Sequence, residues 1–556
     1  RTPSLELYSN ELLELTLHAA ARIVELMTAA VDQLSFEVRQ HYEHELLYEY
    51  RRACSLAVDE DSKFKCQETA AVLARTIEGF RDRANEDRQF VRYKVLVGYD
   101  SVYPKHWTDE SFDFSRAEAY RKTEAERFID EITPDTEAEW FSFIERCAAT
   151  KSQDLATFPT FGEFLVLFSK RKPEIADRCF ARGSKDLLGF LPALLAGLSQ
   201  SPAREIYKRN LEEQLAKGGH LLALARHLRN CDTGQKALPR RIQEKAIAAS
   251  DDVAVMECLV LVMERFGSGK IDDEEEIFRS SVTYLTKKRD ARWINGAWFL
   301  PKAGEFLTSI SRENAELLLS NLVSFPKVDY HLERILGQVA EHHLDLVWKF
   351  FSDRLNHKET DEDEGRYEDI PFQFHGLEKQ LSRSPKQAIE IGRIWFAADD
   401  KLFRFKGGRL ISRAFPHCTE EFAASLAGLV STGDERDAEF VLEIVQNYHG
   451  EETTHEVLKR IVAKYPDDRH KLSKVRLSFD GTGVISGAFG YVEALRAKKI
   501  LLEKWLTDLR VEVVTFASAH IRELDLRMAA EQLRAEQDVE MRKRDFPDDN
   551  DDEIST

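Results

Sequence analysis

The sequence lacks most of the features that mark disulfide-stapled, zinc-binding or membrane proteins. Its seven cysteines include no CxxC pair, so neither a zinc cage nor a disulfide framework is indicated. No stretch approaches the roughly 18 uninterrupted apolar residues of a membrane span, and residues 1–30 carry acids where an export signal would be basic. These absences predict a cytoplasmic chain with reduced thiols and no membrane partner.

Glycine and proline are also scarce, at 26 and 15 of 556 residues. Leucine, alanine and long charged side chains are abundant, which favours a mainly helical protein over a sandwich or barrel. The length exceeds that of one hydrophobic core, so two or three units or a stacked array are expected. The net charge of −19 argues against a general nucleic-acid coat, although local basic patches would still be able to bind phosphates.

What the sequence does contain is a run of short amphipathic helices between about residues 300 and 465. The clearest are predicted after a capping Thr419, after a turn at Gly433 and Asp434, and after a capping box formed by Thr453 and Glu456. None of these helices buries its apolar stripe alone, so each depends on its neighbours. We predict an all-α fold, a helical-repeat (HEAT-like) solenoid with an N-terminal helical bundle.

The first predicted helix carries a heptad seam, and two interpretations of it are open. The seam consists of Leu13, Leu17, Ala20, Val24, Met27, Val31, Leu34 and Val38. A coiled-coil dimer is one interpretation. A helix buried in a bundle is favoured, because four further apolar residues, Leu12, Leu15, Ile23 and Leu26, widen the stripe.

Composition and turn signals divide the chain into four regions. Residues 1–100 are predicted to form an N-terminal bundle or linker, and residues 101–470 the solenoid. Residues 471–535 are predicted to form a Gly-rich hinge and the last HEAT-like helices, and residues 536–556 a charged, disordered tail. Alternating Tyr93, Val95 and Val97 predict a short strand before the first boundary, and the acidic stretch 357–369 predicts a solvated loop.

Residues 198–202 (LSQSP) and 381–385 (LSRSP) resemble each other, and each is predicted to mark the start of a helix. A Ser cap followed by Pro at the first helical position is a helix-start signal. Its recurrence predicts one helix-pair unit used twice.

Two glycine-rich segments resemble phosphate-binding loops but fail their spacing tests. Gly267, Ser268, Gly269 and Lys270 are followed by Ile271, where a Ser or Thr should hold magnesium, so a surface turn is predicted. The second segment contains Gly481, Gly483, Gly487 and Gly490, in GxGxxxG spacing, after a strand predicted from Val475, Leu477 and Phe479. We interpret it as a hinge, and we predict no cofactor.

No residue constellation indicates catalysis. One predicted helix brings four possible metal ligands close together, His41, His44, Glu45 and Glu49. The sequence reads HELLY instead of HExxH, which favours a charged helix face over a metal site. No Ser, Cys or His pattern supplies a nucleophile with its base. The chain is therefore not predicted to be an enzyme.

Two islands of basic and aromatic residues are the candidate partner-binding sites. One consists of Lys287, Lys288, Arg289, Arg292, Trp293 and Trp298. The other consists of Arg404, Phe405, Lys406 and Arg409, together with Phe403, Gly407 and Gly408. Such islands suit an acidic partner or a nucleic-acid backbone, with the rings supplying stacking or hot-spot area.

A family resemblance begins at residues 505–524, WLTDLRVEVVTFASAHIREL, which are similar to the second half of a HEAT repeat. Asp508, Val513 and Ala517 match the repeat, while Val514 stands in place of the usual Arg, so a regular Asp and Arg ladder is not predicted. Residues 480–495 (DGTGVISGAFGYVEAL) and 148–165 (AATKSQDLATFPTFGEFL) resemble C-terminal helical regions of large bacterial STAND-type NTPases of antiphage defence. That resemblance implies a sensor or scaffold arm that binds a phage protein and releases an upstream NTPase.

Three hypotheses for function follow. The leading one is a recognition or scaffold module that binds a protein partner on a helical-repeat surface. A nucleic-acid-binding solenoid that uses the two islands is the alternative, and an enzyme with an unrecognised site ranks third. Oligomerisation, and an NTPase or effector upstream of Arg1, are left open.

Overall fold

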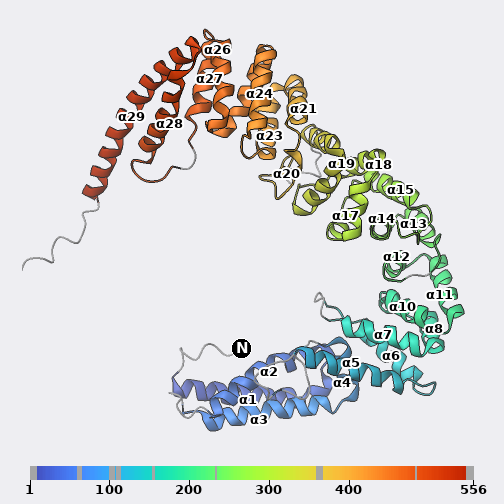
Figure 1. The fold of residues 1–556 in the computed structure, drawn as a ribbon. Coiled ribbons are helices and arrows are strands. Elements are labelled where there is room, and N and C mark those ends of the chain that lie inside the picture. Colours follow the sequence, from blue (N-terminus) through green and yellow to red (C-terminus); the bar gives the residue numbers. More distant parts are fainter. Residues whose placement is uncertain are drawn as a thin grey trace, which may run out of the picture. The chain divides into compact units, whose positions relative to one another are not determined.

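A computed structural model describes residues 9–58, 65–98, 107, 114–152, 157–231, 234–357, 367–482 and 485–545. All regular secondary structure in those ranges is helical, which confirms the prediction of an all-α helical-repeat solenoid with an N-terminal bundle (Figure 1). The chain forms two compact units. Unit 1 comprises Arg1–Leu261 and Gly267–Asp273, and unit 2 comprises Val262–Phe266 and Glu274–Thr556.

Unit 1 begins with a bundle of three helices, α1 (Asn10–Ala29), α2 (Phe36–Val58) and α3 (Gln67–Asn85). α3 contacts both α1 and α2, and their shared core includes Leu17, Leu47 and Ile77. The continuous seam predicted from Leu13 to Val38 is wrong, because α1 ends at Ala29 and a 3-10 turn, Val31–Gln33, separates it from α2. The four residues thought to widen the buried stripe, Leu12, Leu15, Ile23 and Leu26, are exposed.

The remainder of unit 1 consists of short helices. They are α4 (Arg88–Val97), α5 (Phe114–Glu131), α6 (Glu137–Ala148), α7 (Pro159–Arg171), α8 (Pro173–Arg182), α9 (Lys185–Leu188), α10 (Leu191–Gln200), α11 (Arg204–Lys217), α12 (Leu221–Asn230) and α13 (Leu238–Ala249). In one layer α5, α7, α10 and α12 contact each other in that order, and α8 and α11 pack against this layer. The unit boundary falls within α14 (Asp252–Glu264).

A ladder of ion pairs joins α6, α8, α11 and α13. Arg178 on α8 pairs with Glu137 on α6, and Arg209 on α11 pairs with Asp177 on α8. The Arg241 guanidinium on α13 then holds both carboxylate oxygens of Glu212 on α11, at 2.8 and 2.7 Å. The sequence did not predict this ladder, because a HEAT-like pattern of Asp and Arg is recognisable only within residues 505–524.

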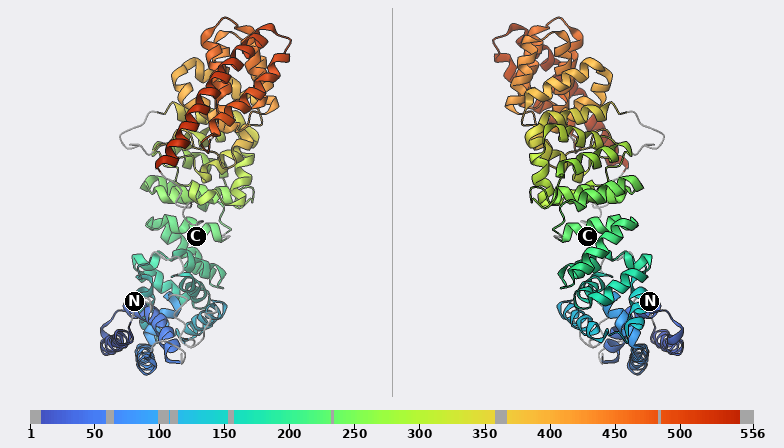
Figure 2. Two further views of the ribbon diagram at one scale, coloured as in Figure 1. Left: turned by 90° about the vertical axis from the view of Figure 1, so that its left-hand side faces the viewer. Right: turned by 90° about the vertical axis from the view of Figure 1, so that its right-hand side faces the viewer.

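Unit 2 consists of α15 (Glu274–Lys287), α16 (Ile294–Ala297), α17 (Pro301–Ser309), α18 (Arg312–Leu322), α19 (Tyr330–Leu355), α20 (Glu378–Leu381), α21 (Pro385–Ala398), α22 (Asp400–Leu402), η3 (Phe403–Gly407), α23 (Gly408–Ala414), α24 (Glu420–Thr432), α25 (Glu435–Val445), α26 (His455–Lys464), α27 (Arg469–Asp480), α28 (Gly490–Glu503) and α29 (Val511–Asp545), with short turns η4 (Gln446–Tyr448), η5 (Glu452–Thr454) and η6 (Lys504–Thr507). Contacts run along one layer through α21, α24, α26 and α29, and along the other through α20, α23, α25, α27 and α28. Figure 2 shows these helices stacked on one another.

Turn chemistry sets several helix starts in unit 2. Thr419 caps α24 as predicted, since its side chain accepts the N–H of Phe422. The predicted capping box at Thr453 is wrong, because η5 occupies that position and α26 begins only at His455. A capping box is found instead at Asp434 and Asp437, at the start of α25.

The two predicted strands are helices. Tyr93, Val95 and Val97 lie in α4, which contacts α2, α3, α5, α6 and α7. Because helices surround α4, the side chains from Arg92 to Val97 are all buried, and the alternation seen in the sequence does not mark a strand. Val475 and Phe479 share the buried face of α27 while Leu477 is exposed, which is helical spacing.

The two predicted helix-start signals do not behave alike. Pro385 is the first residue of α21 as predicted, whereas α11 begins at Arg204, beyond Pro202.

Several sequence predictions lie partly outside the described residues. They include the boundary near residue 100, most of the acidic stretch 357–369, and Gly483. Residues 536–545, the start of the tail predicted to be disordered, are helical, and residues 546–556 lie outside the described ranges.

Candidate interaction surface

The first predicted island divides into exposed cations and a buried aromatic. Lys287, Lys288 and Arg289 lie exposed at the end of α15, and Arg292 forms an ion pair with Asp290 at 2.6 Å. Trp293 is 1% exposed, and its Nε1 donates to Asn321 at 2.8 Å. Trp293 therefore belongs to the core of unit 2, which makes it unsuitable as the partner anchor predicted from sequence.

Trp298 is half-buried within an aromatic cluster. Its ring stacks on His331 with centroids 4.3 Å apart, and the Tyr330 ring meets it edge-on at 5.7 Å. The Arg334 guanidinium lies 5.9 Å from the Trp298 centroid. The cluster holds the start of α19 against the α16–α17 segment.

The second island is built around a π-helical turn, η3. The N–H of Gly408 donates to the Phe403 carbonyl five residues earlier. Phe403 is buried against Phe396 and Phe440, and a Cβ on Gly407 would lie 2.6 Å from the Phe403 ring. The wide turn therefore requires glycine at residue 407, and π-helical turns recur at functional sites.

Two cations of this island are engaged within the chain. Arg404 pairs with Asp400 at 3.1 Å and approaches Glu443 at 3.5 Å. Lys406 forms an ion pair with Asp369. Phe405 is 72% exposed, and Arg409 is also exposed.

Two residues that sequence analysis missed extend the second island. Phe372 is 81% exposed, and the Arg413 guanidinium lies over its ring at 5.6 Å from the centroid. Arg413 also donates to the Pro371 carbonyl. With Lys406 bound to Asp369, these contacts place residues 369–372 beside η3 and α23. We name Phe372, Phe405, Arg409 and Arg413 the aromatic–basic surface.

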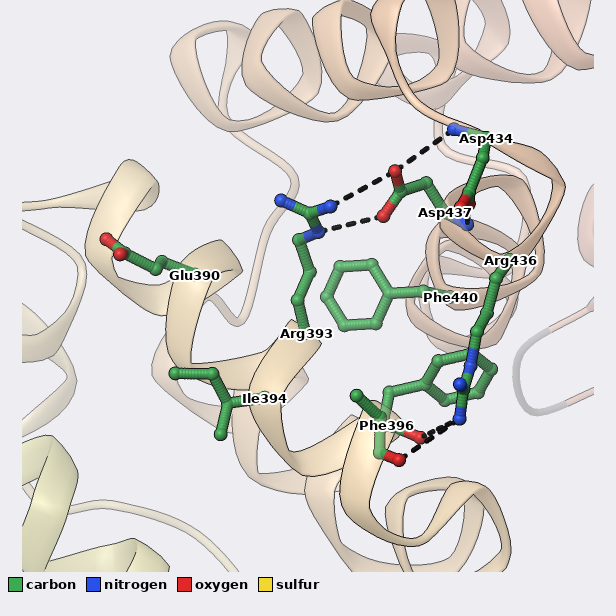
Figure 3. A pocket seen from close by; sticks show the side chains of 9 residues that line it. Glu390, Arg393, Ile394, Phe396, Asp434, Arg436, Asp437 and Phe440 are labelled. Atoms are coloured by element: carbon green, nitrogen blue, oxygen red, sulfur yellow. Dashed lines mark hydrogen bonds and ion pairs between the residues drawn. The ribbon is translucent and has the colours of Figure 1, made fainter.

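A groove between α21 and α25 is shown in Figure 3. It has a volume of about 390 Å³ and adjoins one of about 470 Å³ that shares Phe396, Asp434 and Arg436. Arg393 grips Asp437 through two contacts of 2.8 and 3.1 Å, and Arg436 donates to the Phe396 and Ala397 carbonyls. Both arginines in the groove are therefore already engaged.

Three further properties of the described residues concern thiols, metal ligands and membrane spans. Burial raises the pKa of Cys179 to about 12 and that of Cys418 to about 11, so these thiols are not activated nucleophiles. Within the same part of the chain no group of three or more His, Cys, Asp or Glu residues is placed to hold a metal ion. Nor does any helix in the described ranges combine the length and apolar character needed to cross a bilayer.

Comparison with known proteins adds little to this geometry. No family model matches the chain, and no curated protein matches it. Among solved structures, a "Circular tandem repeat protein with novel repeat topology and enhanced subunit contact surfaces" is similar at 14% identity, over 94% of this chain and 98% of that one. Its TM-score of 0.14 is too low to support an argument about fold or function.

Proposed function

We propose that this chain is a macromolecular recognition module that binds a protein partner through the aromatic–basic surface of unit 2. The observation that carries the proposal is the exposure of Phe372 and Phe405, at 81% and 72%, beside two arginines. When a partner covers a large apolar ring that is in contact with water, the free energy of the complex falls. Aromatic and arginine side chains also dominate binding energy at protein interfaces.

The partner segment is expected to be acidic with apolar residues. Arg409 and Arg413 lie one helical turn apart on α23, so an approaching carboxylate meets both. The exposed rings of Phe372 and Phe405 add apolar contact area to this surface.

A protein partner fits this surface better than nucleic acid. Proteins that hold nucleic acid by its backbone make about 6–10 phosphate contacts. In the second island Arg404 and Lys406 already pair with acids of the chain, which leaves Arg409 and Arg413 for a partner. Two cations on this surface are too few for a phosphate track.

The finer role that we propose is a sensor or scaffold arm of a bacterial antiphage protein, acting in the cytoplasm and without catalysis of its own. Its support is the resemblance of residues 148–165 and 480–495 to helical regions of STAND-type NTPases. Sequencing the reading frame on both sides of this chain tests the role. A linked NTPase or effector is expected, and a frame without one would contradict it.

Selection from a displayed peptide library tests the binding surface. Peptides enriched on the wild-type protein should combine acidic and apolar residues. The double variant Phe372→Ser/Phe405→Ser should weaken their binding about 30-fold or more, as expected for the loss of hot-spot rings.

Leu509→Ser is the matched control, because Leu509 is an apolar residue of unit 2 that is 99% exposed and outside the surface. Equal binding by the double variant and the control would refute the surface. Strong, salt-sensitive binding of single-stranded DNA, lost in Arg409→Glu, would favour the nucleic-acid alternative.

A further inference from the structure

Helix α1 carries a second apolar stripe on the side that faces away from its core. The core side is formed by four residues buried in the N-terminal bundle, Leu13, Leu17, Ala21 and Val24. The outer stripe consists of Leu12, Leu15, Ile23 and Leu26, which are 49%, 65%, 57% and 57% exposed, together with the exposed Ala19. Single exposed apolar residues are ordinary, but a continuous patch of large ones marks an interaction site.

The spacing of the outer stripe places its five residues on one face of the helix. Successive members are three, four, four and three residues apart, which is helical periodicity. Because each residue of a helix rises 1.5 Å, the stripe runs about 21 Å along α1. Soluble proteins cover an apolar stripe of this kind by packing another helix against it.

The order of these steps is the same from either end, with Ala19 at the centre. A two-fold axis through Ala19 therefore places Leu12 opposite Leu26 of a second copy, and Leu15 opposite Ile23 of that copy. Ala19 meets its own counterpart on the axis, where its small side chain lets the two helices approach closely. The stripe is thus complementary to itself, as a contact between identical chains across a two-fold axis requires.

The charges beside the stripe favour the antiparallel arrangement over the parallel one. In a parallel pair, each charge would lie at the level of its own copy, and like charges that meet across an interface repel each other. In the antiparallel pair, Glu11, Arg22 and Glu25 lie at the level of the uncharged Met27, Thr16 and Leu13 of the second copy. Arg22 and Glu25 are already paired within α1 at 2.6 Å.

We infer that two copies of this chain associate through an antiparallel pair of α1 helices, in which each helix covers the outer stripe of the other. A stable dimer buries about 800 Å² of each partner. One helix face with four large side chains offers less than that area. The association is therefore expected to be weak, with a dissociation constant in the micromolar range.

Sedimentation velocity of the full chain, from low micromolar to several hundred micromolar, tests the inference. The wild-type protein should pass from monomer to dimer as its concentration rises. Leu15→Glu/Ile23→Glu should weaken this association about 10-fold or more, because the antiparallel pair would bring the new carboxylates of the two copies together. Its melting temperature should stay unchanged, since both positions are exposed on a helix.

Leu477→Glu/Ile500→Glu is the matched control. These two residues lie on α27 and α28 and are 69% and 56% exposed, and their replacement adds the same charge. The control should associate as the wild type does. A wild-type protein that stays monomeric throughout, or equal association by the α1 variant and the control, would overturn the inference.

Disulfide trapping tests the orientation of the two helices. Ala19→Cys should form a linked dimer under mild oxidation, because the two copies of residue 19 meet on the axis. Leu12→Cys should not, because its counterpart lies about 21 Å away along the helix. The wild-type protein, with its seven cysteines, gives the background. Linkage at both positions, or at neither, would contradict the antiparallel pair.

This inference is independent of the proposed function, because α1 lies in unit 1 and the aromatic–basic surface lies in unit 2. Phe372→Ser/Phe405→Ser should therefore associate as the wild type does, and the two proposals fail separately. One consequence alone rests on the proposed function. A dimer carries two aromatic–basic surfaces, so a partner with two suitable segments would bind it more tightly than it binds the monomer.

Discussion

The Lys94 ammonium lies 2.8 Å from the Glu43 carboxylate, and neither side chain is exposed to solvent. Both oxygens of Glu43 accept from Lys94, and Asn85 donates to one of them at 3.2 Å. Burial lowers the pKa of Lys94, and the Glu43 carboxylate opposes that shift. The pair joins α4 to α2, so it fixes how the first repeat helix meets the N-terminal bundle.

Removing one member of this pair should destabilise unit 1 strongly. Lys94→Met leaves the Glu43 carboxylate buried without a cation, which costs about 3–5 kcal/mol. The double variant Lys94→Met/Glu43→Leu should recover most of that loss, because an apolar pair of similar volume carries no desolvation penalty. Urea denaturation measures both, and equal loss in the single and double variants would contradict the argument.

Arg354 is predicted to hold the loop that carries Phe372. Its buried guanidinium donates to the Val323, Phe325 and Asp369 carbonyls at 3.0, 2.6 and 3.1 Å. Arg354→Lys keeps the charge but supplies fewer donors in a different geometry, so a loss of about 2 kcal/mol or more is expected. Hydrogen exchange of residues 367–374 should accelerate, and unchanged protection there would refute the role.

Acid should destabilise unit 1 through His227. Burial lowers the pKa of His227 from 6.5 to about 4, and its Nε2 lies 3.0 Å from the Tyr207 hydroxyl. Between pH 4 and pH 6.5 the unfolded chain binds a proton on His227 that the folded chain does not bind. The contribution of neutral His227 to the free energy of unfolding is therefore fully present above pH 6.5 and falls by about 3 kcal/mol as the pH drops to 4.

His227→Phe is the variant that isolates this effect. It should lower stability at neutral pH, because Tyr207 loses its partner, but it should flatten the fall between pH 6.5 and 4. Urea denaturation across this pH range measures the slope. An identical slope in the variant and the wild type would show that other groups carry the acid sensitivity.

Two glycines of one helix pair should respond to alanine with opposite signs. A Cβ on Gly197 in α10 would lie 2.1 Å from the Val166 carbonyl oxygen of α7, so Gly197→Ala should cost about 3 kcal/mol or more. A Cβ on Gly162 in α7 meets nothing within 4 Å, and Gly162→Ala should stabilise by about 0.5–1 kcal/mol. Thermal melts of the two variants give the comparison, and shifts of the same sign would contradict the packing.

Much of the fold was predictable because its signals are local. Thr419 and Asp434 each precede a run of apolar residues at helical spacing, and both cap the helix that follows. The same local signals failed where neighbours on several sides bury the helix, as for Tyr93 to Val97 in α4. They also failed at Thr453, where the chain first makes a 3-10 turn.

The candidate surface was only half predictable, because exposure depends on contacts between distant segments. Phe405 and Arg409 belong to an island visible in the sequence, whereas Phe372 reaches η3 through a loop fixed by Arg354 and Arg413. Trp293 and Trp298 looked equivalent, yet Trp293 is buried in the core, where its Nε1 donates to Asn321 of α18.

By itself the sequence determined that this protein is built from short amphipathic helices in a repeating array, because helical spacing and capping act within a few residues. Only the tertiary structure decided which face of each helix is covered. It also decided that a charge such as that of Glu43 is buried beside a partner, since that partner, Lys94, is brought from another helix.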